Sequence, residues 1–286
     1  GEPKATTQAD AWIFSRLAKL SAAVTGYVET YQFGEMAREL HNFFWNEFCD
    51  WYIEFSKASL KEEGEARLQT QRNLVYVLDN ALRLLHPAMP FVTEAIWENV
   101  PKTEGEEAPA LMVAKWPEPD ELAHWIDEDA ERAVSLLVDV VSAVRSTRAR
   151  YGISPKQELS VVVRTNVDNA FVLEGLKSQI ASMARASELS VVPADAQKPA
   201  ESACVVAHGC EVYCVLAGLI DFDAERARLE KEKKQLEKDE AKFAKKLFNP
   251  GFLAKAAPEI VEKDTAKLAD LRDKLARVEE QLAALA

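Results

Sequence analysis

The sequence is poor in helix-breaking residues and has no long apolar run. Its 286 residues include only 10 glycines and 12 prolines, which favours helix because both residues destabilise helix interiors. The longest apolar candidate, residues 133–144, is interrupted by Asp139, so we expect no membrane span. The first 30 residues lack the basic start and apolar run of a secretory signal.

Cysteine is also scarce, and the four cysteines are too few for a disulfide scaffold in a chain of this length. We therefore expect a reducing, cytoplasmic setting. Cys204, Cys210 and Cys214 surround His208 in a C-x3-H-x-C-x3-C spacing, which differs from the paired C-x2-C patterns of zinc sites. Cys210 and Cys214 would share one face of a strand as core thiols, so we predict no metal site.

Net positive charge is missing, since the formal charge is −12. Residues 1–220 hold 20 Lys and Arg against 32 Asp and Glu, whereas residues 221–286 hold 15 of each. Within the latter, 226–255 carries 10 basic and 5 acidic residues, and 242–255 carries four lysines and no acid. Salt screens charges beyond about 8–10 Å, so phosphate contact depends on local charge. The acidic whole-chain balance therefore does not exclude an RNA partner.

The length and the hydrophobic share of 48% suit about two domains with cores of their own. Because residue 1 is Gly rather than Met, we expect a piece of a longer protein.

Residues 7–150 are patterned as helices. Thr7 to Asp10 matches a capping box. Apolar residues then recur along one helical face, namely Ile13, Leu17, Leu20, Val24 and Val28. We expect further helices at about 35–57, 65–86, 90–97 and 121–150, and a surface loop at 101–119. These elements predict an antiparallel helical bundle over residues 1–152.

The pattern changes over residues 153–218, where we expect a small α+β connector. Residues 158–164 alternate in polarity as a strand does. The other expected elements are a helix at about 168–184 and strands at about 188–192, 203–207 and 211–216.

Residues 219–286 predict an antiparallel coiled-coil hairpin. A leucine-rich seam with spacings of three and four ends the chain, formed by Leu268, Leu271, Leu275, Val278, Leu282 and Leu285. The preceding helix repeats every seven residues, at Phe222, Leu229, Leu236 and Phe243. The break at 249–251 (Asn-Pro-Gly) is a turn signal. We predict that Leu229 packs near Val278 and Leu236 near Leu271; a Leu229–Leu268 pairing would contradict this register.

Several motifs have a structural interpretation. The aromatic run from Trp45 to Tyr52 predicts core packing. Asp50 and Glu54 share a helical face, and Lys57 is the expected ion-pair partner of Glu54. His86 precedes Pro87 at a helix end, with no nucleophile nearby in sequence, and we expect a structural histidine.

Two basic clusters remain. The first comprises Arg145, Arg148, Arg150 and Lys156. It either complements a helix dipole or contacts phosphate, and both possibilities stay open. The second lies on the hairpin and comprises Arg226, Arg228, Lys233, Lys234, Lys238, Lys242, Lys245, Lys246 and Lys255. Such runs usually belong to a solvated coiled-coil exterior. Here the acids thin out towards the turn, which favours phosphate contact.

Four strings, in this order and at these separations, resemble bacterial valyl-tRNA synthetases. They are Asn46 to Tyr52, Leu85 to Trp97, Arg145 to Pro155, and Phe248 to Pro258 closing into the leucine seam. The resemblance covers essentially the whole chain. It implies an anticodon-binding bundle, a connector, and a C-terminal arm that grips the outer corner of tRNA(Val).

The catalytic strings of that family, His-x-Gly-His and Lys-Met-Ser-Lys-Ser, are absent. The resemblance therefore implies that the catalytic and editing domains lie upstream, that ATP and Mg belong to the parent catalytic domain, and that this part has no catalytic residue or cofactor of its own. Unpaired bases are bound by stacking on aromatic rings, and we nominate Tyr31 and Phe33. We expect a monomer. The alternative is a coiled-coil protein–protein module without an RNA role.

Overall fold

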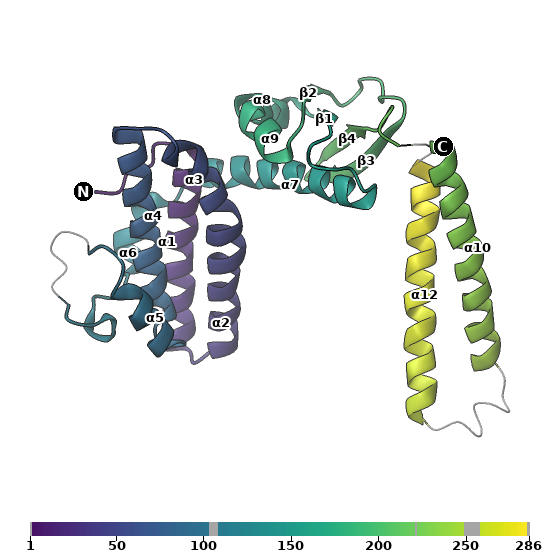
Figure 1. The fold of residues 1–286 in the computed structure, drawn as a ribbon. Helices are drawn as coiled ribbons and strands as arrows, with labels where there is room; N and C mark the ends of the chain where they lie inside the picture. Colours follow the sequence, from purple (N-terminus) through teal and green to yellow (C-terminus); the bar gives the residue numbers. More distant parts are fainter. Residues whose placement is uncertain (1, 103–107, 221, 249–257, 285–286) are drawn as a thin grey trace. The chain divides into compact units, whose positions relative to one another are not determined.

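The fold is known from a computed structural model, which describes residues 2–102, 108–220, 222–248 and 258–284. The chain divides into two compact units, Gly1–Val138 and Asp139–Ala286. The first is helical, and the second holds a four-stranded sheet and a helical hairpin (Figure 1). The predicted mainly α fold is confirmed. The finer division into three domains stays a prediction.

The first helix, α1 (Gln8–Glu29), begins at the predicted capping box. The Asp10 amide donates to Thr7 Oγ1 at 3.1 Å, and the Thr7 amide donates to Asp10 Oδ2 at 3.0 Å. The buried Tyr52 hydroxyl donates to Asp10 Oδ1 at 2.7 Å, which ties the helix start to the second helix. The predicted apolar face is buried, except that Val28 at the last turn is exposed.

The second helical stretch runs through α2 (Phe33–His41), a π-helical segment (Asn42–Tyr52) and α3 (Ile53–Leu60). The predicted helix is thus confirmed, but its central turns are π-helical, which the sequence did not indicate. Phe48 and Tyr52 are buried as predicted. Core packing is wrong for Trp45, because its side chain is exposed.

Helices α4 (Glu65–Leu85) and α5 (Pro90–Trp97) meet at a junction held by His86. The His86 Nδ1 lies 2.8 Å from Thr93 Oγ1, so this histidine joins the two helices as expected. Lys57 pairs with Glu54, also as expected. The predicted surface loop is partly wrong, because Leu111 in the 3-10 turn Leu111–Val113 is buried.

The predicted helix over 121–150 is also wrong at its start. Helix α6 (Pro119–Leu122) and the 3-10 turn Ala123–Trp125 come first, and α7 (Glu128–Arg150) follows after a break. Tertiary contacts explain the break. The Asp127 amide donates a hydrogen bond to Ser15 Oγ at 2.9 Å. Asp127 Oδ1 accepts a hydrogen bond from the Ala130 amide at 2.8 Å, as the side chain of an N-cap residue does.

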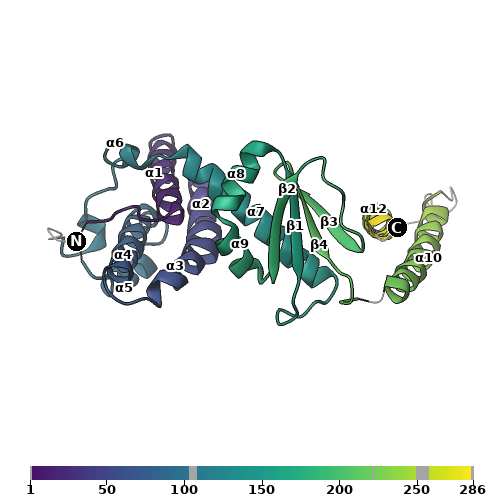
Figure 2. The same cartoon turned by 90° about the horizontal axis from the view of Figure 1, so that it is seen from above.

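The sheet of the second unit has the order β2-β1-β4-β3 (Figure 2). Its strands are β1 (Ser160–Thr165), β2 (Glu188–Pro193), β3 (Ser202–Ala207) and β4 (Cys210–Val215). Only the β1–β2 pair is parallel. The four predicted strands are confirmed. The single predicted helix is wrong, since α8 (Val167–Gly175) and α9 (Lys177–Ala184) are separated at Leu176, whose backbone leaves the helical region.

Two cysteines of the sheet, Cys210 and Cys214, have the core role predicted for them. Cys210 and Cys214 are fully buried, and Cys214 pairs across the sheet with Val161 and Ala203. Cys204 pairs with Tyr213 and so lies on the opposite face. His208 Nδ1 instead lies 2.7 Å from the Asp139 carboxylate. Within the described residues, no group of three or more His, Cys, Asp or Glu side chains is placed to hold a metal ion.

The hairpin consists of α10 (Phe222–Leu247) and α12 (Pro258–Ala284). Buried Leu229 packs with buried Val278, so the predicted register is confirmed at this point and the Leu229–Leu268 alternative is not adopted. The Asn-Pro-Gly turn lies outside the described residues. In the part of the chain that the structure describes, no helix combines the length and the apolar character that a membrane span requires.

Candidate nucleic-acid interface

Part of the basic charge on the hairpin is neutralised by ion pairs. Lys233 Nζ lies 2.7 Å from the Glu279 carboxylate on α12, and this contact raises the pKa of Lys233. Lys246 Nζ lies 2.6 Å from the buried Asp264 carboxylate. Arg228 pairs with Glu232 at 3.1 Å within α10. These three cations, all nominated from the sequence, therefore also stabilise the hairpin.

A second set of lysines forms an outward stripe along α10, which we call the lysine stripe. Its members share an exposed position and a spacing of three or four residues, and they are Lys231, Lys234, Lys238, Lys242 and Lys245. At 100° per residue they fall within an arc of about 80°, roughly 160° around the helix from the seam leucines Leu229 and Leu236. No acidic residue of α10 falls within that arc.

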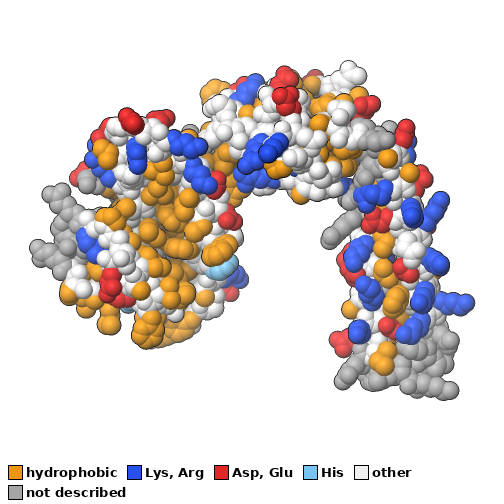
Figure 3. All heavy atoms as spheres, in the orientation of Figure 1, with side chains coloured by type: hydrophobic (Ala, Val, Ile, Leu, Met, Phe, Trp, Pro, Cys, Tyr) orange, Lys and Arg blue, Asp and Glu red, His pale blue; other side chains and the backbone are white. Residues whose placement is uncertain are grey.

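The lysine stripe carries free positive charge. None of its five ammonium groups has an ion-pair or hydrogen-bond partner among the residues that the structure describes. The stripe extends from Lys231 to Lys245, which is 15 residues or about 21 Å of helix. Figure 3 shows Lys and Arg side chains along the visible face of the hairpin. Of the hairpin cations predicted from the sequence, Lys255 lies outside the described residues. Lys231 belongs to the stripe but was not among the predicted cations.

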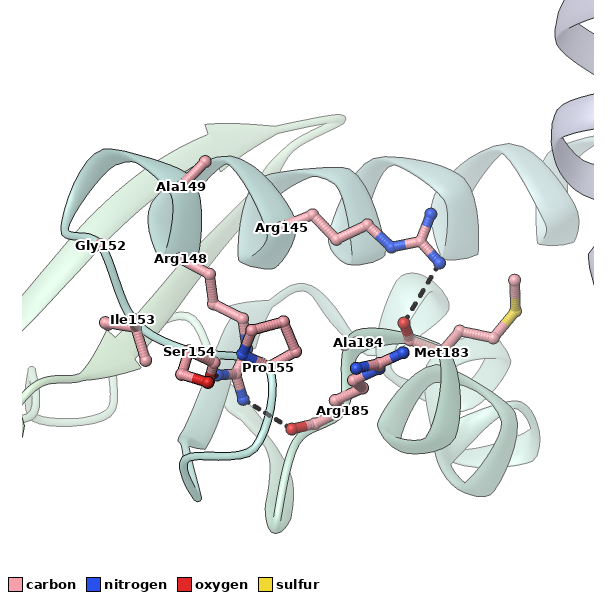
Figure 4. Close-up of a pocket in the computed structure, with 10 residues that line it drawn as sticks. All are labelled: Arg145, Arg148, Ala149, Gly152, Ile153, Ser154, Pro155, Met183, Ala184 and Arg185. Atoms are coloured by element: carbon pink, nitrogen blue, oxygen red, sulfur yellow. Dashed lines mark hydrogen bonds between the residues drawn. The ribbon is translucent and has the colours of Figure 1, made fainter.

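A groove of about 560 Å³ lies at the end of α7, beside the following loop and the end of α9 (Figure 4). Three arginines line it, Arg145, Arg148 and Arg185, and none of its lining residues is acidic. An arginine guanidinium presents a fork of donors that matches phosphate oxygens. The groove therefore has the charge and the donors of an anion-binding surface.

Arg148 is the structural member of this groove. Its side chain is only 6% exposed, and its guanidinium donates to the backbone carbonyls of Ser154 (3.0 Å), Gln157 (3.2 Å) and Arg185 (2.6 Å). Burial lowers the pKa of Arg148, yet a guanidinium stays charged at neutral pH. Arg148 thus fixes the loop after α7 against the end of α9 and leaves its positive charge beneath the groove.

The other nominated cations of this region have different surroundings. Arg145 Nη2 donates to the Met183 carbonyl at 3.2 Å on the groove wall. The Arg150 guanidinium lies over the Tyr151 ring at 5.6 Å, away from the groove lining. Lys156 lines a neighbouring hollow that it shares with Arg185. Arg185 itself was missed from the sequence, because it is distant in sequence from the cluster; its positive φ of 52° ends α9 and brings it to the groove.

Two exposed aromatic pairs lie on the first unit. Tyr31 is 81% exposed and contacts Phe33 edge-on at 6.2 Å. Tyr31 also has a positive φ of 59°, which is uncommon for a residue other than Gly. The second pair, His41 and Trp45, was missed because the sequence pattern predicted a buried aromatic run. Both pairs offer ring faces that a planar ligand could cover.

Two family models match parts of the chain that include these surfaces. Residues 10–163 match the family model described as the anticodon-binding domain of tRNA ligase. Residues 221–286 match the model described as the valyl tRNA synthetase tRNA binding arm, which includes the lysine stripe.

Curated relatives match over almost the whole chain. The chain is 37% identical over 294 residues to a valine–tRNA ligase of Symbiobacterium thermophilum, with 97% of this chain and 32% of the relative covered. It is 39% identical over 283 residues to that of Geobacillus stearothermophilus and 40% identical over 281 residues to that of Enterococcus faecalis, with 98% of this chain and 31% of the relative covered in each. The chain therefore spans about a third of the length of these relatives.

Proposed function

Because the chain belongs to the tRNA ligase family that carries this anticodon-binding domain, we propose that it binds tRNA, and specifically tRNA(Val). The lysine stripe is the observation that carries the proposal, since five exposed ammonium groups on one helical face, without a partner among the described residues, suit a polyanion. A hairpin that only served to dimerise would need no such acid-free stripe opposite its seam.

The hairpin would contribute affinity that depends little on base sequence. Phosphate contacts by Lys and Arg release counterions, so each neutralised phosphate adds about 0.7–0.9 to the slope of log K against log salt. Five stripe lysines would therefore give a slope of roughly 3.5–4.5 if each met one phosphate. The stripe faces away from the partner helix, so binding requires no opening of the hairpin.

The first unit would bind the anticodon region. Unpaired RNA bases are bound by stacking on aromatic rings and by hydrogen bonds to their edges, and Tyr31 and Phe33 offer exposed rings. The arginine groove of the second unit would hold a backbone phosphate, with Arg145 and Arg185 as donors and Arg148 as a positioning residue. Arg150 and Lys156 would add screened, longer-range attraction.

The longer relatives are valine–tRNA ligases. We assign valine activation, ATP and Mg to the part of such a protein that lies outside this chain, together with editing. This chain would contribute tRNA binding without a cofactor of its own, as part of a cytoplasmic monomer.

The test is a titration of the chain with a tRNA(Val) transcript at several salt concentrations. Binding that weakens steeply with salt, and that prefers tRNA(Val) over a tRNA of different anticodon, is the expected result. The rival proposal is a coiled-coil protein–protein module. It predicts no salt-dependent tRNA binding and a dimer in sedimentation velocity, and that pair of results would replace the present proposal.

A further inference from the structure

We propose that His41 and Trp45 form a binding site for an unpaired nucleobase, read at its edge by Asn46. This inference rests on the proposed function, because it names a site within the RNA-binding surface of the first unit. It is independent of the lysine stripe, which would contact phosphates rather than bases.

The exposure of Trp45 is the first observation. All six tryptophans lie within the described residues, and Trp45 alone is exposed, at 60% of its surface. In the surrounding segment Phe43, Phe48 and Tyr52 are buried, and Phe44 and Trp51 are half-buried. Trp45 therefore lies outside the packing that holds this helix in the first unit. Exposed indole surface is costly in water and is enriched where a partner covers it.

The second observation is the geometry of the aromatic pair. The His41 and Trp45 rings are nearly parallel, with an interplanar angle of 13° and centroids 6.2 Å apart. They lie at the junction of α2 with the π-helical segment. Such segments are rare and occur often at functional sites. Two parallel rings on consecutive turns present flat faces of the kind on which nucleobases stack irrespective of their identity.

The third observation is a chain of polar side chains beside the rings. Asn46 Nδ2 donates to Asn42 Oδ1 at 2.9 Å, and Asn42 Nδ2 donates to Glu47 Oε1 at 3.1 Å. Arg16 then holds the Glu47 carboxylate through two bonds of 2.9 Å. This chain orients the exposed Asn46 amide. An amide has both donor and acceptor and can pair with the edge of a base.

The arrangement fits a base better than an apolar side chain. A hydrophobic partner would bury Asn46 Oδ1, which accepts no hydrogen bond from the described residues, and burying an unsatisfied amide oxygen is costly. The Glu47 carboxylate at the end of this series of hydrogen bonds is paired with Arg16, and the contact raises the pKa of that arginine. The negative charge of Glu47 is therefore neutralised by Arg16 and would repel an RNA strand less than an unpaired carboxylate. A planar ligand with polar edges can stack on the rings and form hydrogen bonds with the Asn46 amide.

The experiment measures binding of the whole chain to a tRNA(Val) transcript by fluorescence anisotropy at four salt concentrations, with Trp45→Ala, Trp45→Phe and Asn46→Ala. Phe171→Ala is the matched control, because Phe171 is an 84% exposed aromatic ring on α8 of the other unit. Trp45→Ala should weaken binding by roughly 5–150-fold, the equivalent of about 1–3 kcal/mol per stacked base. Trp45→Phe should restore most of it.

The salt slope separates this site from the phosphate-binding hairpin. Stacking releases no condensed counterions, so Trp45→Ala should leave the slope unchanged while it lowers the affinity. Unchanged affinity in Trp45→Ala, or a loss no larger than in Phe171→Ala, would overturn the base site and leave tRNA binding itself intact. A chain that binds no tRNA at all would overturn the proposed function as well.

Discussion

The lysine stripe leads to a sharp prediction about charge on the hairpin. The variant replaces Lys242 and Lys245 with Gln, which removes two positive charges from the stripe and keeps side chains that favour helix. Neither lysine has a partner among the described residues, so the hairpin should fold unchanged. Lys246 is unsuitable, because it pairs with Asp264 at 2.6 Å and its loss would destabilise the hairpin.

The magnitude follows from counterion release. If each lysine meets one phosphate, the slope of log K against log salt should fall by about 1.4–1.8. The affinity ratio between the unchanged chain and the variant should then shrink by roughly 7–12-fold between 50 and 200 mM salt. The free energy of unfolding should change by less than about 0.5 kcal/mol, as for other surface substitutions.

The matched control replaces Lys267 and Lys274 on α12 with Gln. It changes the net charge equally, but both ammonium groups already pair with Asp270, at 3.2 and 2.9 Å. These contacts lower the pKa of Asp270. Anisotropy titrations with a tRNA(Val) transcript at four salt concentrations give both slopes. Equal slopes for the stripe variant and the control would refute the reasoning, because binding would then depend on net charge rather than on the stripe.

Other predictions concern the supporting structure. Arg148→Ala removes bonds to three carbonyls and should lower the free energy of unfolding by about 3 kcal/mol, against less than about 1 kcal/mol for the surface control Arg150→Ala, both measured by urea denaturation. Tyr52→Phe leaves Asp10 Oδ1 without its hydrogen-bond donor and should lower the free energy of unfolding by about 1.5–3 kcal/mol in the same assay. Burial raises the pKa of Cys214 to about 11, above the 9.0 of a free thiol. The folded state then keeps a proton that the unfolded state loses, so stability should fall as pH rises from 9 to 11, by at most about 2.7 kcal/mol. Cys214→Ala should abolish that part of the pH dependence, and an unaltered pH profile would contradict the assignment.

The local elements of this fold follow from short-range chemistry. The capping box at Thr7 and Asp10 predicts the start of α1 because both partners lie within one turn. The position of the Asn-Pro-Gly break predicts the register of the hairpin, because folding the chain back there aligns the two apolar seams, and Leu229 packs with Val278 accordingly. The alternating residues of β1 predict its buried face, because successive side chains of a strand point to opposite faces of the sheet.

The misses arise where distant residues decide local structure. The break before α7 depends on Ser15, which is more than a hundred residues away and accepts the Asp127 amide. The exposure of Trp45 could not be predicted from the sequence either, because a run of aromatic residues predicts burial. Only the packing of the helices shows which ring stays exposed. Arg185 joins the arginine groove through its own turn at the end of α9, and no spacing near Arg148 indicates that.

The sequence by itself determined the helical bundle, the sheet strands, the hairpin and the basic character of its tail, since each depends on periodicity within a few turns. Only the tertiary structure decided which cations form ion pairs and which have no partner among the described residues. Lys233 and Lys246 face carboxylates on the opposite helix, whereas Lys242 faces away from the seam. The physical reason is that pairing depends on distances across the hairpin, and those distances exist only once the two helices have packed together.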